Sequence, residues 1–344
     1  MLLITTVLAT TLLAFLLSWM LTALMRRYAL SAALLDHPNE RSSHSVPTPR
    51  GGGMAIVLSF LALAGGLAAF GLASPVLVAA LLGSGGSVAV VGFLDDRQAL
   101  PARWRFLAHA VAAVWSLWLM HGIPKVAMLG FEVDLGGFGL ALAGVYLVWM
   151  INLFNFMDGI DGIASVEAIS TSLGGALCWW LATGTPDWPV PVLFAACVLG
   201  FLVWNYPPAK IFMGDAGSGF LGMVLGLLSL WTAQQAPQVF WCWFILFGCF
   251  MVDATTTLVR RVRRGETFNE AHRSHAYQYA ARRHGSHRNI TLAFAAINLG
   301  WLLPIALLVA SARLDGVIAS AIAYTPLVWL AFRYKAGDRL GQQP

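Results

Sequence analysis

The chain has 344 residues, of which 58% are hydrophobic and only 11% are charged, and its mean hydropathy is +0.73. A soluble domain usually carries about 25% charged residues, so this composition excludes a sizeable soluble domain. The net charge of +5 is consistent with attraction to anionic lipid and with an anionic substrate. The four cysteines have no metal-ligand or CxxC spacing, so we interpret them as small apolar core residues.

Eleven apolar runs are long enough to cross roughly 30 Å of hydrocarbon. In chain order they lie near 2–24, 54–72, 76–94, 104–123, 138–157, 163–183, 188–206, 217–233, 237–259, 290–311 and 314–332. The first run has no basic leading segment and no cleavage site, so it should stay as an anchor. The sequence thus predicts an all-α polytopic integral membrane protein, with residues 1–344 in a single transmembrane domain. A small hairpin is expected within residues 124–137.

The orientation follows from the basic residues, because positively charged loops stay on the cytoplasmic side. Of the 21 Lys and Arg residues, only Lys125 and Arg313 fall in the other set of loops. This predicts a periplasmic amino terminus and a cytoplasmic carboxyl terminus. The cytoplasmic loops are expected near 25–53, 95–105, 157–163, 206–217 and 260–289.

Acidic residues gather at the ends of apolar runs on this predicted cytoplasmic face. Asp95 and Asp96 are adjacent at a helix end, where two carboxylates repel unless a divalent metal or a pair of basic side chains lies beside them. Alone, such a pair would be read as two solvated loop acids. Three further acids or acidic motifs, NLFNFMDGIDGIA, GDAGSG and Asp253, share the face and weaken that alternative.

The motif NLFNFMDGIDGIA places Asn152, Asn155 and Asp158 within a sector of roughly 120° at a helix end. Polar groups along one stripe are expected to face a cavity rather than lipid. The two glycines that follow interrupt the helix, and they let Asp161 and backbone amides approach a ligand. The alternative is structural: asparagine side chains that bridge neighbouring helices and an Asp that caps the next helix. This is plausible for one of the four residues but poor for all four.

Asp215 lies in GDAGSG, directly before the eighth apolar run. Flexible backbone on both sides suits an oxygen ligand of Mg²⁺, and the following helix amino terminus favours phosphate nearby. The alternative is an ordinary N-cap Asp. Upstream, Asn205 ends the seventh run, and the rigid turn YPPAKIF is expected to bring Lys210 and Phe212 to the same face.

Two cytoplasmic loops are rich in basic residues. The loop at 260–289 contains eight arginines and four histidines, including His272 and His275, but lacks a cysteine or carboxylate that would complete a zinc site. We interpret these arginines as ligands of phosphate oxygens. For residues 260–264, a basic loop that faces lipid is the alternative. In the first loop, Arg50 precedes three glycines whose amides are expected to crowd against an anion.

The motifs PTPRGGG, FLDDR, NLFNFMDGIDGIA, NYPPAKIFMGDAGS and HRSHAYQ occur in this order along nearly the whole chain. Together they resemble the polyprenyl-phosphate N-acetylhexosamine-1-phosphate transferase family, of the glycosyltransferase family 4 type. The HRSHAYQ form is most similar to O-antigen initiating transferases that use 6-deoxy sugars such as FucNAc or QuiNAc.

The resemblance implies transfer of sugar 1-phosphate from a UDP-N-acetylhexosamine to undecaprenyl phosphate, with release of UMP. It implies a Mg²⁺ ion, with Mn²⁺ as the alternative, bound by Asp215 and Asn155. The implied catalytic residues are Asp95, Asp96, Asn155, Asp158 and Asp215. The implied substrate-binding residues are Arg50, Asn152, Asp161, Asn205, Lys210, Phe212, His272, Arg273 and His275.

Within that set, the resemblance places uridine against Asp161, Asn205 and Phe212, and the diphosphate against the 272–275 loop. Relatives often have a charged residue where this chain has Ala99, so Arg103 or Arg105 is expected to supply the charge. Membrane lipid is an expected partner, nucleic acid is not, and a homodimer is one option for assembly.

Two other functions fit parts of the pattern. A transporter or flippase of lipid-linked sugar would have ionisable residues near the bilayer midplane and broken helices in related halves. Most acids here lie instead at the cytoplasmic ends. A CDP-alcohol phosphotransferase is suggested by DGIDGIA, but the AR pair and the further spaced aspartates of that family are missing.

Overall fold

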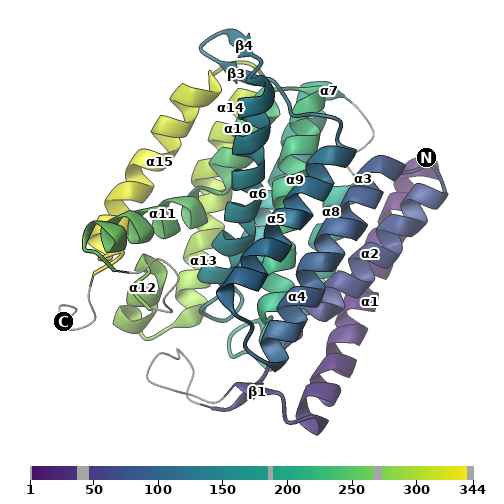
Figure 1. The fold of residues 1–344 in the computed structure, drawn as a ribbon, viewed down its shortest axis with the longest axis vertical. Coiled ribbons are helices and arrows are strands. Elements are labelled where there is room, and N and C mark those ends of the chain that lie inside the picture. Colours follow the sequence, from purple (N-terminus) through teal and green to yellow (C-terminus); the bar gives the residue numbers. More distant parts are fainter. Residues whose placement is uncertain (1, 37–45, 185–188, 267–272, 339–344) are drawn as a thin grey trace.

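The computed structural model describes residues 2–36, 46–184, 189–266 and 273–338, and these form a bundle of helices packed side by side (Figure 1). The helices are α1 (Leu2–Ser31), α2 (Met54–Ala69), α3 (Pro75–Ala80), α4 (Gly86–Arg97), α5 (Ala102–Leu119), α6 (Gly136–Met157), α7 (Ile163–Thr183), α8 (Pro189–Asn205), α9 (Asp215–Gln235), α10 (Gln238–Leu246), α11 (Gly248–Arg263), α12 (Ala276–His284), α13 (His287–Ile297), α14 (Leu303–Ala310) and α15 (Gly316–Arg333). Short π-helical turns, Leu81–Gly85 and Asn298–Leu302, join α3 to α4 and α13 to α14.

Each of the eleven predicted apolar runs coincides with a helix or a series of joined helices. Within the described ranges, six helical stretches are long and apolar enough to cross a membrane, or seven if the bent pair α10 and α11 is one span. The structure therefore confirms a mainly helical protein suited to a membrane. The count of eleven and the orientation stay predictions.

The run at 237–259 is predicted as one span, and the structure divides it into two helices. α10 and α11 meet at a bend of 71° after Phe247. With 9 residues, α10 rises only about 14 Å, less than half of the hydrocarbon thickness. The sequence at the break, Phe247-Gly248, carries no proline, so the apolar pattern gave no sign of the bend.

The bend has a specific polar partner inside the bundle. A new helix exposes unpaired N–H groups in its first turn, and Glu167 of α7 lies near the N–H of Phe250 in that turn of α11. Glu167 is fully buried, and its Oε2 accepts a hydrogen bond of 2.7 Å from Nδ2 of Asn298. Asn298 itself begins a π-helical turn and also donates to Ser170 at 2.7 Å. Three chain segments thus meet at the break.

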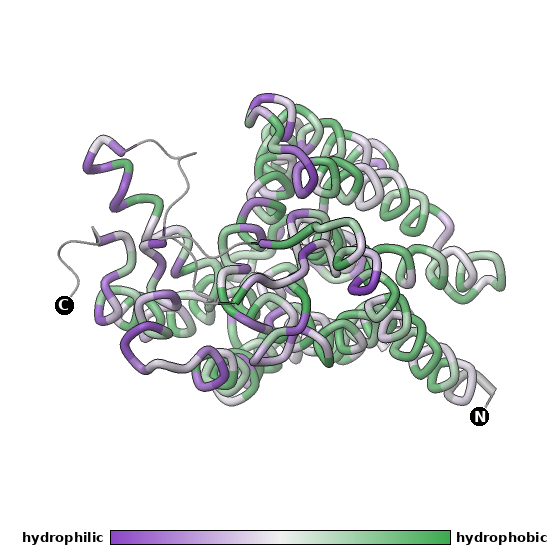
Figure 2. Tube along the Cα trace, turned by 90° about the horizontal axis from the view of Figure 1, so that it is seen from below, coloured by the Kyte–Doolittle hydropathy of each residue, from purple (hydrophilic) through white to green (hydrophobic). Residues whose placement is uncertain are grey.

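Two small strand pairs flank the bundle. The predicted hairpin within 124–137 is confirmed as β3 (Val126–Met128) and β4 (Phe131–Val133), which pair antiparallel. At the other end, β1 (Leu35–Asp36) pairs with β2 (Thr48–Pro49). Viewed from the β1 end, most hydrophilic segments lie in the loops, whereas the helices are mostly hydrophobic (Figure 2).

α9 is the central helix, because 94% of its apolar window is buried, against 22% for α1. Its glycines permit this packing: a Cβ on Gly222 would lie 2.1 Å from the carbonyl oxygen of Met150 in α6. The acid that begins α9, Asp215, is thereby fixed at the centre of the bundle. The ends of α4 and α6, which carry the other acidic motifs, meet it there.

Replacing Glu167 should test the polar junction at the bend. Glu167→Leu removes the Oε2 acceptor of Asn298 Nδ2, at a cost of about 1–3 kcal/mol for this buried group. Glu167→Gln keeps a carbonyl oxygen and should lose less. The measurement is the apparent melting temperature of the purified protein in detergent; equal values for the two variants would refute this role.

Candidate active site

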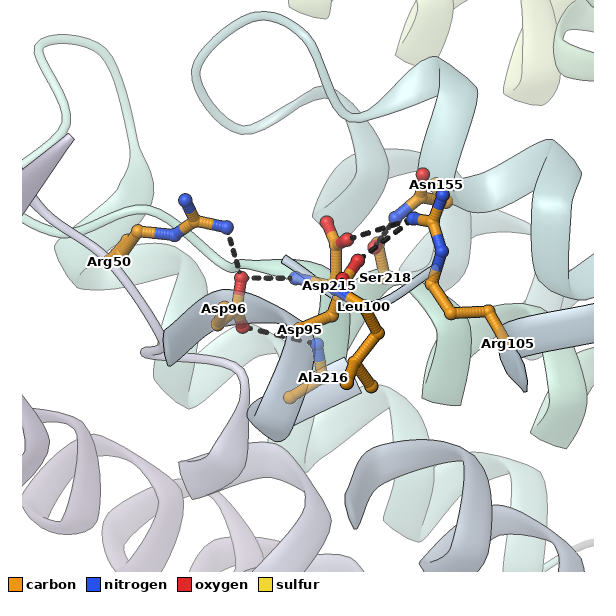
Figure 3. A network of polar contacts seen from close by, with 9 residues as sticks. All are labelled: Arg50, Asp95, Asp96, Leu100, Arg105, Asn155, Asp215, Ala216 and Ser218. Carbon is orange, nitrogen blue, oxygen red and sulfur yellow. Dashed lines mark hydrogen bonds and ion pairs between the residues drawn. The ribbon is translucent and has the colours of Figure 1, made fainter. Parts of the chain in front are cut away.

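The carboxylate of Asp96, in the last turn of α4, joins three segments (Figure 3). Its Oδ1 accepts a hydrogen bond of 3.0 Å from the N–H of Asp215, and its Oδ2 accepts one of 3.3 Å from Ala216. The guanidinium of Arg50 pairs with the same carboxylate. Only 5% of the Asp96 side chain is exposed. Asp96 therefore caps the positive amino terminus of α9 from a neighbouring helix.

Two glycines allow this close approach. A Cβ on Gly92 of α4 would lie 2.5 Å from the backbone nitrogen of Ala216, and one on Gly214 would lie 2.5 Å from the Asp96 carboxylate. Gly214 also has φ = +77°, a conformation that side chains rarely adopt. Glycine at these positions is thus a condition for the contact between α4 and α9.

Asp95 has a separate set of partners. Its Oδ1 accepts the N–H of Leu100 at 2.5 Å, and its Oδ2 lies 2.8 Å from Nη1 of Arg105. The repulsion expected between the adjacent acids is therefore relieved by two arginines, one for each carboxylate. Of the two candidates for the charge missing at Ala99, Arg105 makes the contact, whereas Arg103 is exposed and lies over the ring of Trp104.

Asp215 is the most accessible of these acids. Its side chain is 32% exposed, and its Oδ2 lies 3.9 Å from Nη1 of Arg105. Beside it, Nδ2 of Asn155 donates to Oγ of Ser218 at 3.2 Å, which leaves the Asn155 carbonyl oxygen for another partner. Sequence reasoning missed Ser218, although it stands one helical turn after Asp215 in the same GDAGSG motif.

The donor set fits a magnesium ion better than a softer metal. In the part of the chain that the structure describes, no group of three or more His, Cys, Asp or Glu side chains could hold an ion. Asp215 and Asn155 offer two oxygen ligands near each other. Mg²⁺ usually takes one or two protein carboxylates and fills its other positions with water and substrate phosphate. These residues are therefore compatible with Mg²⁺ completed by substrate.

A groove of about 590 Å³ opens from this site between α4, α5, α6 and α9. Its polar end contains Asp95, Arg105, Asn152, Asn155 and Asp215. The remaining walls are mainly apolar, with Val88, Phe106, Val145 and Trp149 among them. The prediction that the asparagine stripe faces a cavity is confirmed for Asn152 and Asn155. Nδ2 of Asn152 donates to the carbonyl of Val148 at 2.7 Å.

Asp158 follows the end of α6, close to the other acids. Burial, together with the nearby carboxylates of Asp215, Asp96 and Asp161, raises the pKa of Asp158 to about 7. Asp158 is thus protonated up to a higher pH than an exposed carboxyl group is.

Asp161 and Asn205 connect the loop after α6 to the turn after α8. Asp161 accepts the N–H of Ala209 at 3.1 Å and lies 3.4 Å from Nδ1 of His287, which sequence reasoning missed. Asn205 accepts the N–H of Gly162 at 3.0 Å and donates to the carbonyl of Ile211 at 3.0 Å. Both ends of the Asn205 amide are engaged, so it holds the two loops together.

Lys210 and Phe212 lie on the turn that Asn205 fixes. Lys210 is exposed, with its ammonium 5.6 Å from the centroid of the Trp204 ring. Phe212 donates its N–H to Pro49 at 2.8 Å and accepts the N–H of Gly52 at 2.9 Å. The turn is thus paired with the segment that carries Arg50.

The prediction that the glycines after Arg50 offer their amides to an anion is wrong for two of the three. The N–H groups of Gly52 and Gly53 donate to the carbonyls of Phe212 and Met213, both at 2.9 Å. The glycines serve close packing instead, since a Cβ on Gly53 would lie 2.3 Å from Cα of Gly217. Arg50 is positioned by this pairing.

The basic loop before α12 is described only in part, and His272 lies outside the described residues. His275 is buried, with Nδ1 3.3 Å from Oδ1 of Asp253, and Arg273 is partly buried. No interaction found in the described residues joins either side chain to Asp96 or Asp215. Asp253 was expected among the site acids, but it accepts the N–H groups of Ala276 and Tyr277, both at 2.9 Å.

α12 nevertheless reaches the site through Tyr277. The hydroxyl of Tyr277 donates to the carbonyl of Phe156 at 3.1 Å, two residues before Asp158. Gly159 leaves room for this contact, since a Cβ there would lie 2.2 Å from the hydroxyl oxygen. α12 therefore supports the loop that carries Asp158 and Asp161.

Comparison with known proteins gives one consistent result. Residues 77–233 match the family described as Glycosyl transferase family 4. A probable undecaprenyl-phosphate N-acetylglucosaminyl 1-phosphate transferase of Bacillus subtilis (strain 168) is 30% identical over 268 residues, 75% of this chain and 72% of the relative. A decaprenyl-phosphate N-acetylglucosaminephosphotransferase of Mycolicibacterium smegmatis (strain ATCC 700084 / mc(2)155) is 30% identical over 319 residues, 81% of this chain and 76% of the relative.

A phospho-N-acetylmuramoyl-pentapeptide-transferase of Streptococcus thermophilus (strain CNRZ 1066) is 26% identical over 249 residues, 69% of this chain and 66% of the relative. The chain therefore belongs to glycosyl transferase family 4, the family of polyprenyl-phosphate sugar-phosphate transferases. The resemblance drawn from the motifs is confirmed at this level.

The raised pKa of Asp158 predicts an effect on stability. Because the pKa rises from 3.8 to about 7 on folding, the fold favours the protonated form, and stability falls as the pH rises through this range. Asparagine cannot ionise, so Asp158→Asn should melt at a higher temperature than the parent at about pH 8 and near the same temperature at about pH 4. Melting in detergent with EDTA is the measurement. A parent that melts higher at both pH values would contradict the assignment.

Proposed function

We propose that this protein transfers N-acetylhexosamine 1-phosphate from a UDP-sugar to undecaprenyl phosphate and releases UMP. The observation that carries the proposal is the position of Asp215, at the junction of a capped helix amino terminus and a mainly apolar groove. Such a junction suits a substrate with a charged head and a long hydrocarbon tail. The activities by which the relatives are named support the same reaction class.

In this reaction an oxygen of the acceptor phosphate attacks the phosphorus that bears the sugar. A new P–O bond forms to the lipid phosphate, and the bond between that phosphorus and the UMP oxygen breaks. UMP leaves with the electron pair of the broken bond. A phosphate monoester has a second pKa of about 6, so it is already a competent nucleophile near neutral pH. We therefore propose direct displacement without a phosphoenzyme.

The charged residues would position these anions. Arg105 lies at the polar end of the groove, between Asp95 and Asp215, where a lipid phosphate would stand. Asp215 and the carbonyl oxygen of Asn155 would hold Mg²⁺, or Mn²⁺. Bound there, the ion would neutralise the negative charge that the two phosphates bring together. Asp95 and Asp96 would act by positioning Arg105 and the first turn of α9.

The donor would then lie on the other side of Asp215, toward the loops fixed by Asp161 and Asn205. Arg50, Lys210 and Phe212 border this region, and the 272–275 loop is proposed to reach the diphosphate. The proposed sugar is an N-acetylated 6-deoxyhexose such as FucNAc or QuiNAc, used to start O-antigen synthesis. The proposed location is a bacterial inner membrane, with this site facing the cytoplasm.

The direct test incubates membranes that contain the protein with radiolabelled UDP-sugar and undecaprenyl phosphate. Butanol-extractable label and released UMP are expected together, whereas a transporter or flippase yields neither. UDP-GlcNAc, UDP-FucNAc and UDP-QuiNAc compared in the same assay identify the preferred sugar.

Asp215→Asn should lower turnover by at least about 100-fold, because the ligand charge at the reacting phosphates is lost. EDTA should abolish turnover of the parent, and added Mg²⁺ should restore it. The matched control is Glu132→Gln, an exposed acid of the β3–β4 hairpin, which should keep full activity. Parent activity that persists in EDTA would contradict the metal proposal.

The two arginines of the α4–α5 region provide a second test. Arg105→Ala removes the charged partner of Asp95, and turnover should fall by about 10- to 100-fold, the effect of a lost charged hydrogen bond. Arg103→Ala removes the same charge from an exposed side chain of the same groove that does not contact Asp95, so turnover should fall less than in Arg105→Ala. Equal losses in the two variants would show that general charge, rather than the Asp95 contact, matters.

A further inference from the structure

A second, separate crevice lies between α11 and α15 and has a volume of about 500 Å³. It is lined by Arg260, Arg263 and Arg264, by Thr255 and Thr256, and by Phe332 of α15. None of these residues belongs to the groove that leads to Asp215. The crevice therefore combines three guanidinium groups and two hydroxyls with an aromatic wall.

The crevice carries more positive than negative charge. Arg260 pairs with Asp338, Arg261 pairs with Glu266, and Arg264 lies 3.1 Å from Glu266 and 3.9 Å from Asp338. With Arg263, four guanidinium groups thus share two carboxylates among the residues that the structure describes. Arg263 is exposed, and no acidic partner is found for it in the described parts of the chain. The surplus charge is complementary to an anion.

The surroundings indicate that this anion belongs to a lipid. Val259 and Phe332, which line the crevice, are 41% and 56% exposed, and the guanidinium of Arg260 lies 5.5 Å from the centroid of the Phe332 ring. α11 turns away from α10 by 71°, so its basic end does not continue along the axis of α10. A free phosphate ion gains nothing from exposed valine and phenylalanine. A phospholipid satisfies both the arginines and the apolar side chains.

We propose that the α11–α15 crevice binds the phosphodiester headgroup of an anionic phospholipid of the surrounding bilayer. Arg263 contacts the phosphate, with Thr255 and Thr256 as further donors, and the acyl chains run along Val259 and Phe332. This site does not depend on the proposed transferase reaction. It gives a ligand to Arg263, for which no acidic partner is found in the described ranges.

The test measures binding of phosphatidylglycerol and of phosphatidylcholine with the same acyl chains, by native mass spectrometry of the purified full chain. Arg263→Gln should weaken the first phosphatidylglycerol adduct about fivefold, the effect of one arginine near an anionic surface. Arg263→Glu should weaken it further. Binding of phosphatidylcholine should be unchanged in all variants.

The matched control is Arg333→Gln, which removes the same charge from an exposed arginine next to Phe332 but outside the crevice. It should change phosphatidylglycerol binding by less than about twofold. An equal loss in both variants, no loss in either, or no preference for phosphatidylglycerol over phosphatidylcholine would overturn the proposal. Displacement of the lipid by millimolar inorganic phosphate, or a loss confined to added undecaprenyl phosphate, would also overturn it.

Discussion

The capping of α9 by Asp96 is the contact on which the candidate site depends. A helix amino terminus at the centre of a bundle presents unpaired N–H groups and a partial positive charge, and leaving these without partners is costly in a low-dielectric interior. Asp96 satisfies two of the N–H groups and also binds Arg50. Because both oxygens of Asp96 are engaged, it positions the site, and the accessible carboxylate is the adjacent Asp215.

Three chain segments pack closely around the first turn of α9, two of them at a glycine. Gly92 brings α4 against the first turn of α9, and Gly53 brings the segment after Arg50 against Gly217. The turn at 206–212 is held from the other side by Asn205. Charged groups from distant parts of the sequence are thereby concentrated where the surrounding helices exclude much of the water. In such surroundings, unbalanced charge is costly, which favours the binding of ions and phosphates that restore the balance.

The sequence predicted the helical class, the hairpin and the meeting of three acidic motifs, since apolar runs and turn residues are local signals. It predicted that Asp95 and Asp96 need positive partners. It did not predict that Arg105 pairs with Asp95 and Arg50 with Asp96. It failed at Gly52 and Gly53, whose amides are used by backbone pairing across 160 residues of chain. It failed also at the α10–α11 bend and at Asp253. These depend on Glu167 and on α12, long-range partners that no local pattern encodes.

α11 contacts several parts of the bundle that lie far apart in the sequence. Its first turn contacts Glu167, its second turn carries Asp253, which caps α12, and its last turn is tied to residues 336–338 by Arg260 and Arg264. Leu258 of the same helix lines the groove that leads to Asp215. A tilt of α11 would therefore change the groove wall and, through α12 and Tyr277, the support of the Asp158 loop together. α11 therefore links the wall of the groove, the cap of α12 and residues 336–338 within one helix.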